Sequence, residues 1–236
     1  LQMITNRQFI SDITNDIKAL SMDDFVSPKF IFNKGVGIVE DFIKKDENFQ
    51  LINLTEGWKE ATCLRMEEVP VTQCDLDMMI CEKLMRSKCR IPDIYSMKNR
   101  KLIRSVSSVD FSNFYEPTTP KGWRNIQNRR DKSDKKYFFW IDGYIYIPVA
   151  KKDSMSSPEQ IRIEAYFQKP WEVDIMGDCS CNKNSDCVKP LDYNFICPNY
   201  LLNDVKQETT KQLAQVYLKI TQDSNPNLNQ IDKNQQ

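Results

Sequence analysis

Four cysteines near the C-terminal end of the chain have a spacing that could bind a metal ion. They follow the pattern Cys179-x-Cys181-x₅-Cys187-x₉-Cys197, in a polar segment with few apolar residues. Four thiolates can hold zinc tetrahedrally, and the ion would then stabilise such a loop. The spacing departs from two CxxC pairs, so we favour reduced thiols, some of them buried, and expect no cofactor. Structural zinc and a disulfide formed after cell lysis are the alternatives.

A basic segment that contains one tryptophan is the second candidate site. Its members are Lys121, Trp123, Arg124, Arg129, Arg130, Lys132, Lys135 and Lys136. Lysine and arginine bind phosphates, and a tryptophan ring can stack on bases, so the segment is a candidate for contact with DNA that is independent of base sequence. Asp131 and Asp134 dilute the positive charge. We therefore favour a solvated loop for this segment, with contact to DNA as the alternative.

Catalysis is not indicated by the residue types. The chain has 236 residues and no histidine, the side chain best suited to proton transfer at neutral pH. Neighbouring carboxylates such as Glu67 and Glu68 fit a solvated surface, and no phosphate-binding glycine loop or nucleophile motif occurs. We therefore predict a protein that is not an enzyme. With 33 basic and 33 acidic residues, no net field attracts nucleic acid or an anionic membrane.

The compartment follows from what the sequence lacks. No run of about 18 apolar residues is present, so we expect no membrane partner. The first ten residues lack the basic and apolar blocks of a secretory signal, which predicts assembly in a cytoplasm. Reduced thiols are then expected for Cys63, Cys74, Cys81 and Cys89 as well, where cysteine acts as a small hydrophobe.

Helical periodicity appears at both ends of the chain. One apolar stripe, formed by Phe9, Ile10, Ile13, Ile17 and Leu20, predicts a first helix. Ser27 and Pro28 predict the start of a second helix, as N-cap and first helical residue. A third helix is expected over 199–221, with Leu202, Val205, Leu213, Val216 and Ile220 on its apolar face and Thr209 at the centre of that face.

Strand formers dominate the middle of the chain. Two aromatic and β-branched runs flank Asp142 and Gly143, whose pairing predicts a β-hairpin with a type I′ turn. Alternating residues over 161–168 predict a third strand beside that hairpin in an antiparallel meander. The predicted fold is α+β, with helices at both ends packed together and an inserted antiparallel β-barrel or sandwich. The predicted segments are a helical segment 1–48, a β-rich domain 49–177, a cysteine loop 178–198, a helix 199–221 and a mobile polar tail 222–236.

Four stretches of the sequence carry a resemblance to a known family. They are Tyr137-Phe-Phe-Trp-Ile-Asp-Gly-Tyr-Ile-Tyr-Ile-Pro148 with Ile161-Arg-Ile-Glu-Ala-Tyr-Phe-Gln-Lys-Pro170, then Val205-Lys-Gln-Glu-Thr-Thr-Lys-Gln-Leu-Ala-Gln-Val-Tyr217, and finally Asn225-Pro-Asn-Leu-Asn229. Over about residues 3 to 230 the chain resembles head-to-tail connector proteins, the neck rings of crAss-like tailed bacteriophages. The motifs are loose, and the family has no catalytic residues to transfer.

The resemblance implies a structural virion protein of a podophage. It would form a homo-oligomeric ring, usually of twelve copies, beneath the portal and would bridge capsid and tail around the DNA channel. Its expected partners are further copies of itself, the portal and neighbouring neck or tail proteins. The basic segment would then face packaged DNA. A zinc-stabilised binding or adaptor module is the alternative function.

Overall fold

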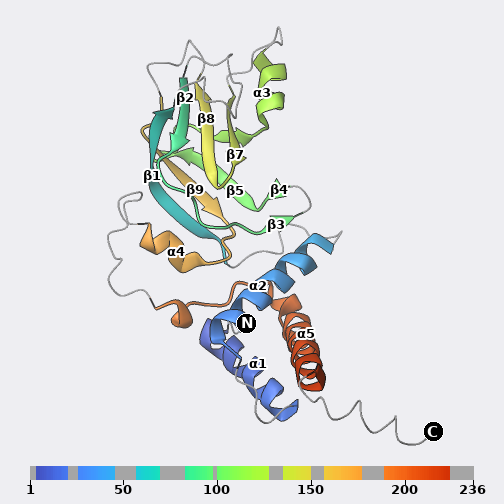
Figure 1. Cartoon of the computed structure of the whole chain (residues 1–236). Coiled ribbons are helices and arrows are strands. Elements are labelled where there is room, and N and C mark those ends of the chain that lie inside the picture. Colours follow the sequence, from blue (N-terminus) through green and yellow to red (C-terminus); the bar gives the residue numbers. More distant parts are fainter. Residues whose placement is uncertain are drawn as a thin grey trace, which may run out of the picture. The chain divides into compact units, whose positions relative to one another are not determined.

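The computed structural model describes residues 4–20, 26–45, 57–69, 83–97, 100–127, 135–149, 157–176 and 189–223 (Figure 1). The chain forms two compact units. One combines the two chain ends, Leu1–Asn53 with Pro190–Gln236, and the other is the inserted segment Leu54–Lys189. The first unit is helical and the second is built around a sheet, so the predicted α+β class, with helices at both chain ends, is confirmed.

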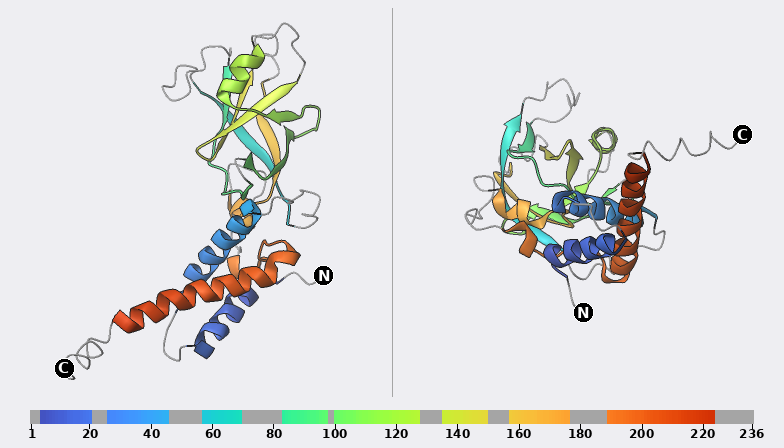
Figure 2. Two further views of the ribbon diagram at one scale, coloured as in Figure 1. Left: turned by 90° about the vertical axis from the view of Figure 1, so that its right-hand side faces the viewer. Right: turned by 60° about the horizontal axis from the view of Figure 1, so that its bottom comes forward.

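In the helical unit, the helices α1 (Asn6–Leu20), α2 (Pro28–Lys45) and α5 (Leu202–Asp223) pack together, as Figure 2 shows. Short 3₁₀ turns, η5 (Pro190–Asp192) and η6 (Asn199–Leu201), precede α5. The two predicted N-terminal helices are confirmed, including the start of α2 at Pro28. On α5, Val205 and Leu213 are fully buried, but Val216 is 44% exposed, so Val216 departs from the predicted apolar face.

A glycine allows close packing inside the helical unit. Gly35 lies on the buried face of α2, and an added Cβ would lie 2.6 Å from Phe9 Cε1. The Phe9 ring is itself stacked on Phe195, with ring centroids 3.9 Å apart. A strand-like bridge between Thr5 and Asn194 holds these two chain ends side by side. The close approach at Gly35 is therefore made by an aromatic ring.

The inserted unit contains a seven-stranded sheet of order β5-β9-β1-β2-β8-β7-β6. Its strands are β1 (Lys59–Val69), β2 (Lys83–Ser87), β5 (Ile103–Ser108), β6 (Tyr115–Pro117), β7 (Lys136–Ile141), β8 (Tyr144–Val149) and β9 (Gln160–Ala165); a separate pair comprises β3 (Ser96–Met97) and β4 (Arg100–Lys101). Helices α3 (Pro120–Gln127) and α4 (Pro170–Ile175) complete the unit. A bridge between Ser107 and Phe114 joins the two sheet edges, which brings the sheet close to a barrel.

The predicted β-hairpin is confirmed, but the prediction that the third strand pairs with this hairpin is wrong. β7 and β8 pair around Asp142 and Gly143, whose φ angles are +50° and +85°. The third predicted strand exists as β9, but it pairs with β1 and β5. The sheet is also not purely antiparallel, because β6 and β7 run parallel. Strand partners depend on tertiary contacts, which local alternation does not specify.

The cysteines of the inserted unit differ from expectation. Cys63 and Cys89 are disulfide-bonded in the structure, so the prediction of reduced thiols is wrong for both. Backbone pairing brings their strands together nearby, since Lys88 N donates to Arg65 O at 2.8 Å. Cys63 also has a φ of +55°, within a β-bulge between Ala61 and Leu64. Cys74 and Cys81 lie outside the described residues.

Candidate functional site

The basic segment is positioned by a short helix and by the strand that follows it. Thr119 caps the start of α3, because its Oγ1 accepts a hydrogen bond from Gly122 N at 3.0 Å and its carbonyl accepts one from Trp123 N at 2.8 Å. Capping by a threonine hydroxyl stabilises the first turn of a helix. Lys121 and Arg124 of α3 are both exposed, and they lie three residues apart on one side of the helix.

Trp123 does not have the predicted role in base stacking. Its side chain is only 5% exposed and belongs to the core cluster formed by Val69, Leu84, Trp123, Phe139 and Tyr146. The indole ring also packs against Tyr137, with centroids 5.8 Å apart. Burial of the apolar surface of the indole is favourable in free energy, and this burial holds α3 against the sheet. The tryptophan therefore holds the two cations of α3 in place and cannot itself reach a nucleotide.

At the start of β7 the positive charge is partly compensated. Lys135 is exposed, and its Nζ donates to Glu116 Oε1 of β6 at 2.6 Å. This hydrogen bond raises the pKa of Lys135. Lys136 is half-buried and lies opposite Tyr115 in the parallel register of β6 and β7. Arg129, Arg130 and Lys132 lie outside the described residues. The described part of the segment thus offers Lys121 and Arg124 as its exposed pair on α3.

The cysteine loop is represented in the structure by Cys197, since Cys179, Cys181 and Cys187 lie outside the described residues. The Cys197 thiol donates to Pro198 O at 3.4 Å, and burial raises its pKa to about 12. Within the described ranges no group of three or more histidine, cysteine or acidic side chains could hold a metal ion. Reduced thiols in the four-cysteine segment stay the prediction, and structural zinc stays its alternative.

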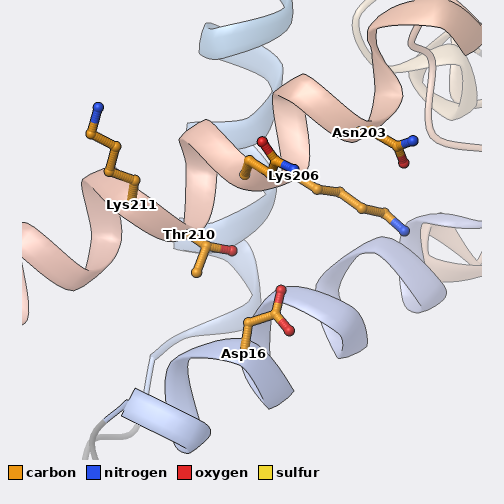
Figure 3. A pocket seen from close by; sticks show the side chains of 6 residues that line it. Asp16, Asn203, Lys206, Thr210 and Lys211 are labelled. Carbon is orange, nitrogen blue, oxygen red and sulfur yellow. The ribbon is translucent and has the colours of Figure 1, made fainter.

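A shallow pocket lined by polar residue types in the helical unit was not predicted from the sequence. It has a volume of about 470 Å³ and is lined by Asp16, Asn203, Lys206, Gln207, Thr210 and Lys211. Figure 3 shows Asp16 of α1 directed toward Thr210 and Lys206 of α5, whereas Lys211 points away. Lys206 forms an ion pair with Asp12 at 2.6 Å. The lysine is thus already neutralised by α1, and the pocket joins two helices without a group poised for chemistry.

A model of a known protein family matches most of the chain. This model, whose name refers to a crAss ring and whose description is phage tail ring protein 2, matches residues 8–234. A search of curated proteins gives no match. In the part of the chain that the structure describes, no helix is long and apolar enough to cross a membrane.

Proposed function

Because the chain belongs to the phage tail ring protein 2 family of crAss-like bacteriophages, and is therefore a structural ring protein of a virion, we propose that it forms one ring of the head-to-tail connector. The ring lies beneath the portal, bridges capsid and tail, and surrounds the channel through which DNA passes. The observation that carries this proposal is the extent of the family match. Residues 8–234 include the whole inserted β unit and most of the helical unit.

The ring consists of identical copies of this chain, with twelve as the expected number. Rings of identical subunits close through heterologous interfaces, in which one surface of each copy meets a different surface of the next. Further interfaces contact the portal and the adjacent neck or tail proteins. Assembly takes place in the cytoplasm of the bacterial host. The role is structural, and no step of it requires a catalytic group.

Contact with DNA is a part of the proposal supported by the exposed pair on α3. Lys121 and Arg124 lie on a helix fixed by the buried Trp123, so their charges are held at one place on each copy. A ring repeats this pair in every subunit and would place a circle of cations around the channel. Such contact depends on phosphate charge alone and weakens with salt.

The test of ring formation is native mass spectrometry of the purified chain under reducing conditions, with and without a chelator. A discrete ring-sized oligomer without metal supports the proposal. A monomer that carries one zinc ion would favour the binding module instead. If the chain is a metal-free monomer, imaging of assembled virions decides, because the portal can serve as template; a neck without this chain would contradict the proposal.

A further inference from the structure

The turn between β5 and β6 exposes aromatic side chains that belong neither to the core of the helical unit nor to the core of the sheet. Phe111 is 52% exposed and Phe114 is 60% exposed, and Val109 beside them is 39% exposed. These three residues, which we call the aromatic tip, lie where the bridge between Ser107 and Phe114 joins the two edges of the sheet. Clustered exposed apolar side chains mark interaction sites more often than isolated ones do.

The aromatic tip is held in one conformation by hydrogen bonds centred on Asp110. Its Oδ1 accepts from Ser108 Oγ at 2.6 Å, from Ser112 Oγ at 2.8 Å and from Ser112 N at 3.1 Å. Ser108 N and Asn113 O close the turn at 2.9 Å. These bonds to the carboxylate lower the pKa of Asp110 to about 2, so the acceptor stays ionised at neutral pH. The turn is therefore preorganised.

The position of the Phe111 ring is also fixed, at a cost to the backbone. The backbone φ angle of Phe111 is +58°, in the left-handed region that a bulky residue rarely adopts. The Arg162 guanidinium of β9 lies over the ring, 4.2 Å from its centroid. Phe114 is close by, with the two ring centroids 6.4 Å apart. Strained backbone that the surrounding contacts enforce is typical of functional segments.

We propose that the aromatic tip docks onto the neighbouring copy of this chain in the ring. This inference rests on the proposed function, and it assigns one half of the heterologous interface that a closed ring requires. Rigid aromatic side chains lose little conformational entropy on binding, which is why they anchor interfaces.

The exposed area fits an anchor within a larger interface between copies. From the usual area of a phenylalanine side chain, the two rings expose on the order of 200 Å². A stable interface buries roughly 800 Å² on each partner. The aromatic tip would thus supply about a quarter of one side. Surrounding contacts supply the rest, which matches the pattern of a few anchors within a wider surface.

Photocrosslinking in assembled virions tests the identity of the occupant. The aromatic analogue p-benzoylphenylalanine replaces Phe114, virions are irradiated, and the crosslinked peptides are identified by mass spectrometry. A covalent dimer of this chain, joined from the aromatic tip to a second copy, is the expected result. A crosslink to a different virion protein, or no crosslink, would overturn the inference while the chain's presence in the neck still supports the proposed function. A neck without this chain would remove both.

A variant of the purified chain gives a second, quantitative test. Phe111→Asn combined with Phe114→Ser removes both rings, and asparagine tolerates the left-handed backbone at position 111. Where the wild-type chain forms rings in solution, we expect this variant to form at least about tenfold fewer. The matched control is Phe30→Ser, which removes an equally large ring, 46% exposed, from α2 of the helical unit. Unchanged ring yield, or equal loss in the control, would overturn the inference.

Discussion

At the scale of single residues, Gly35 and Gly37 both lie on α2 but differ in the space available for a side chain. An alanine Cβ at position 35 would lie 2.6 Å from a buried ring atom of Phe9, and that ring is confined by its stacking on Phe195. At position 37 nothing lies within 4 Å of an added Cβ. We expect Gly35→Ala to lower the free energy of unfolding by about 1–3 kcal/mol. Gly37→Ala is expected to raise it by up to about 1 kcal/mol through helix propensity.

Chemical denaturation of the two glycine variants, monitored by circular dichroism, measures this difference. Because the substitution is the same and the helix is shared, the comparison isolates the contact with Phe9. Equal stabilisation by both alanines would show that the Phe9 ring can move aside.

Trp123 tests whether the basic segment is held by packing. Truncation of a buried tryptophan leaves a cavity and loses transfer free energy, so Trp123→Ala is expected to lower the free energy of unfolding by about 3–5 kcal/mol. Lys121→Ala, on the same helix but exposed, is expected to change it by less than about 0.5 kcal/mol. Thermal unfolding with both variants in parallel gives the answer. A small effect of Trp123→Ala would place the indole outside the core.

Cys197 carries a pH-dependent prediction. The folded thiol has its pKa raised to about 12 by burial, from the ordinary value of 9.0, so it stays protonated at pH 8. Only the thiolate reacts with iodoacetamide. We expect alkylation of Cys197 in the folded chain to be much slower than in urea, measured by peptide mass spectrometry. The raised pKa also makes stability depend on pH. The contribution of this thiol to the free energy of unfolding is constant below pH 9 and falls as the pH rises from 9 toward 12, because the unfolded chain loses the proton first. Equal alkylation rates in both states would show an accessible thiolate.

At the scale of elements, the β7–β8 hairpin depends on two residues with positive φ. An added Cβ at Gly143 would meet Arg90 Nε at 2.7 Å in addition to the strained φ of +85°. We expect Gly143→Ala to lower the free energy of unfolding by at least about 1 kcal/mol. Asp142→Asn keeps a residue that tolerates the turn, and its effect is expected to stay within about 0.5 kcal/mol. Urea titrations of both variants measure the contrast, and similar stabilities would argue against a type I′ turn.

These elements also show what the sequence can and cannot specify. The hairpin and the start of α2 could be predicted because the signals are local: Asp142 with Gly143, and Ser27 with Pro28. The partners of β9 could not, because the choice between β1 and β8 depends on packing between distant segments. The same holds at the candidate site. Trp123 looked available for stacking because nothing in the sequence shows that α3 folds back onto the sheet.

The aromatic tip was missed for a different reason. Ser108, Asp110 and Ser112 alternate with apolar residues, so the stretch looks like a strand interrupted by serines. In the structure their side chains form the hydrogen bonds of a turn. Serine and aspartate commonly bond to nearby backbone in turns, and that signal was present in the sequence. The exposure of Phe111 and Phe114 follows from the turn and could be recognised only with it.

At the scale of the whole molecule, a heterologous ring has a consequence for mixed assembly. Each copy both donates an aromatic tip and accepts one, so a chain that lacks the tip can still accept. Each variant chain therefore weakens one interface of the ring that it enters. Because a ring contains several copies, these losses accumulate, and we expect ring yield to fall more steeply than the fraction of wild-type chains in the mixture.

The measurement is native mass spectrometry of rings assembled from wild-type chain and a mass-tagged Phe111→Asn, Phe114→Ser variant at several ratios. Tagged wild-type chain serves as the control for the tag. Rings with variant copies in proportion to the mixture, at undiminished yield, would show that closure does not need the tip. A steep loss of rings with short arcs in their place would show that each missing tip leaves one interface open, as the geometry of a closed ring requires.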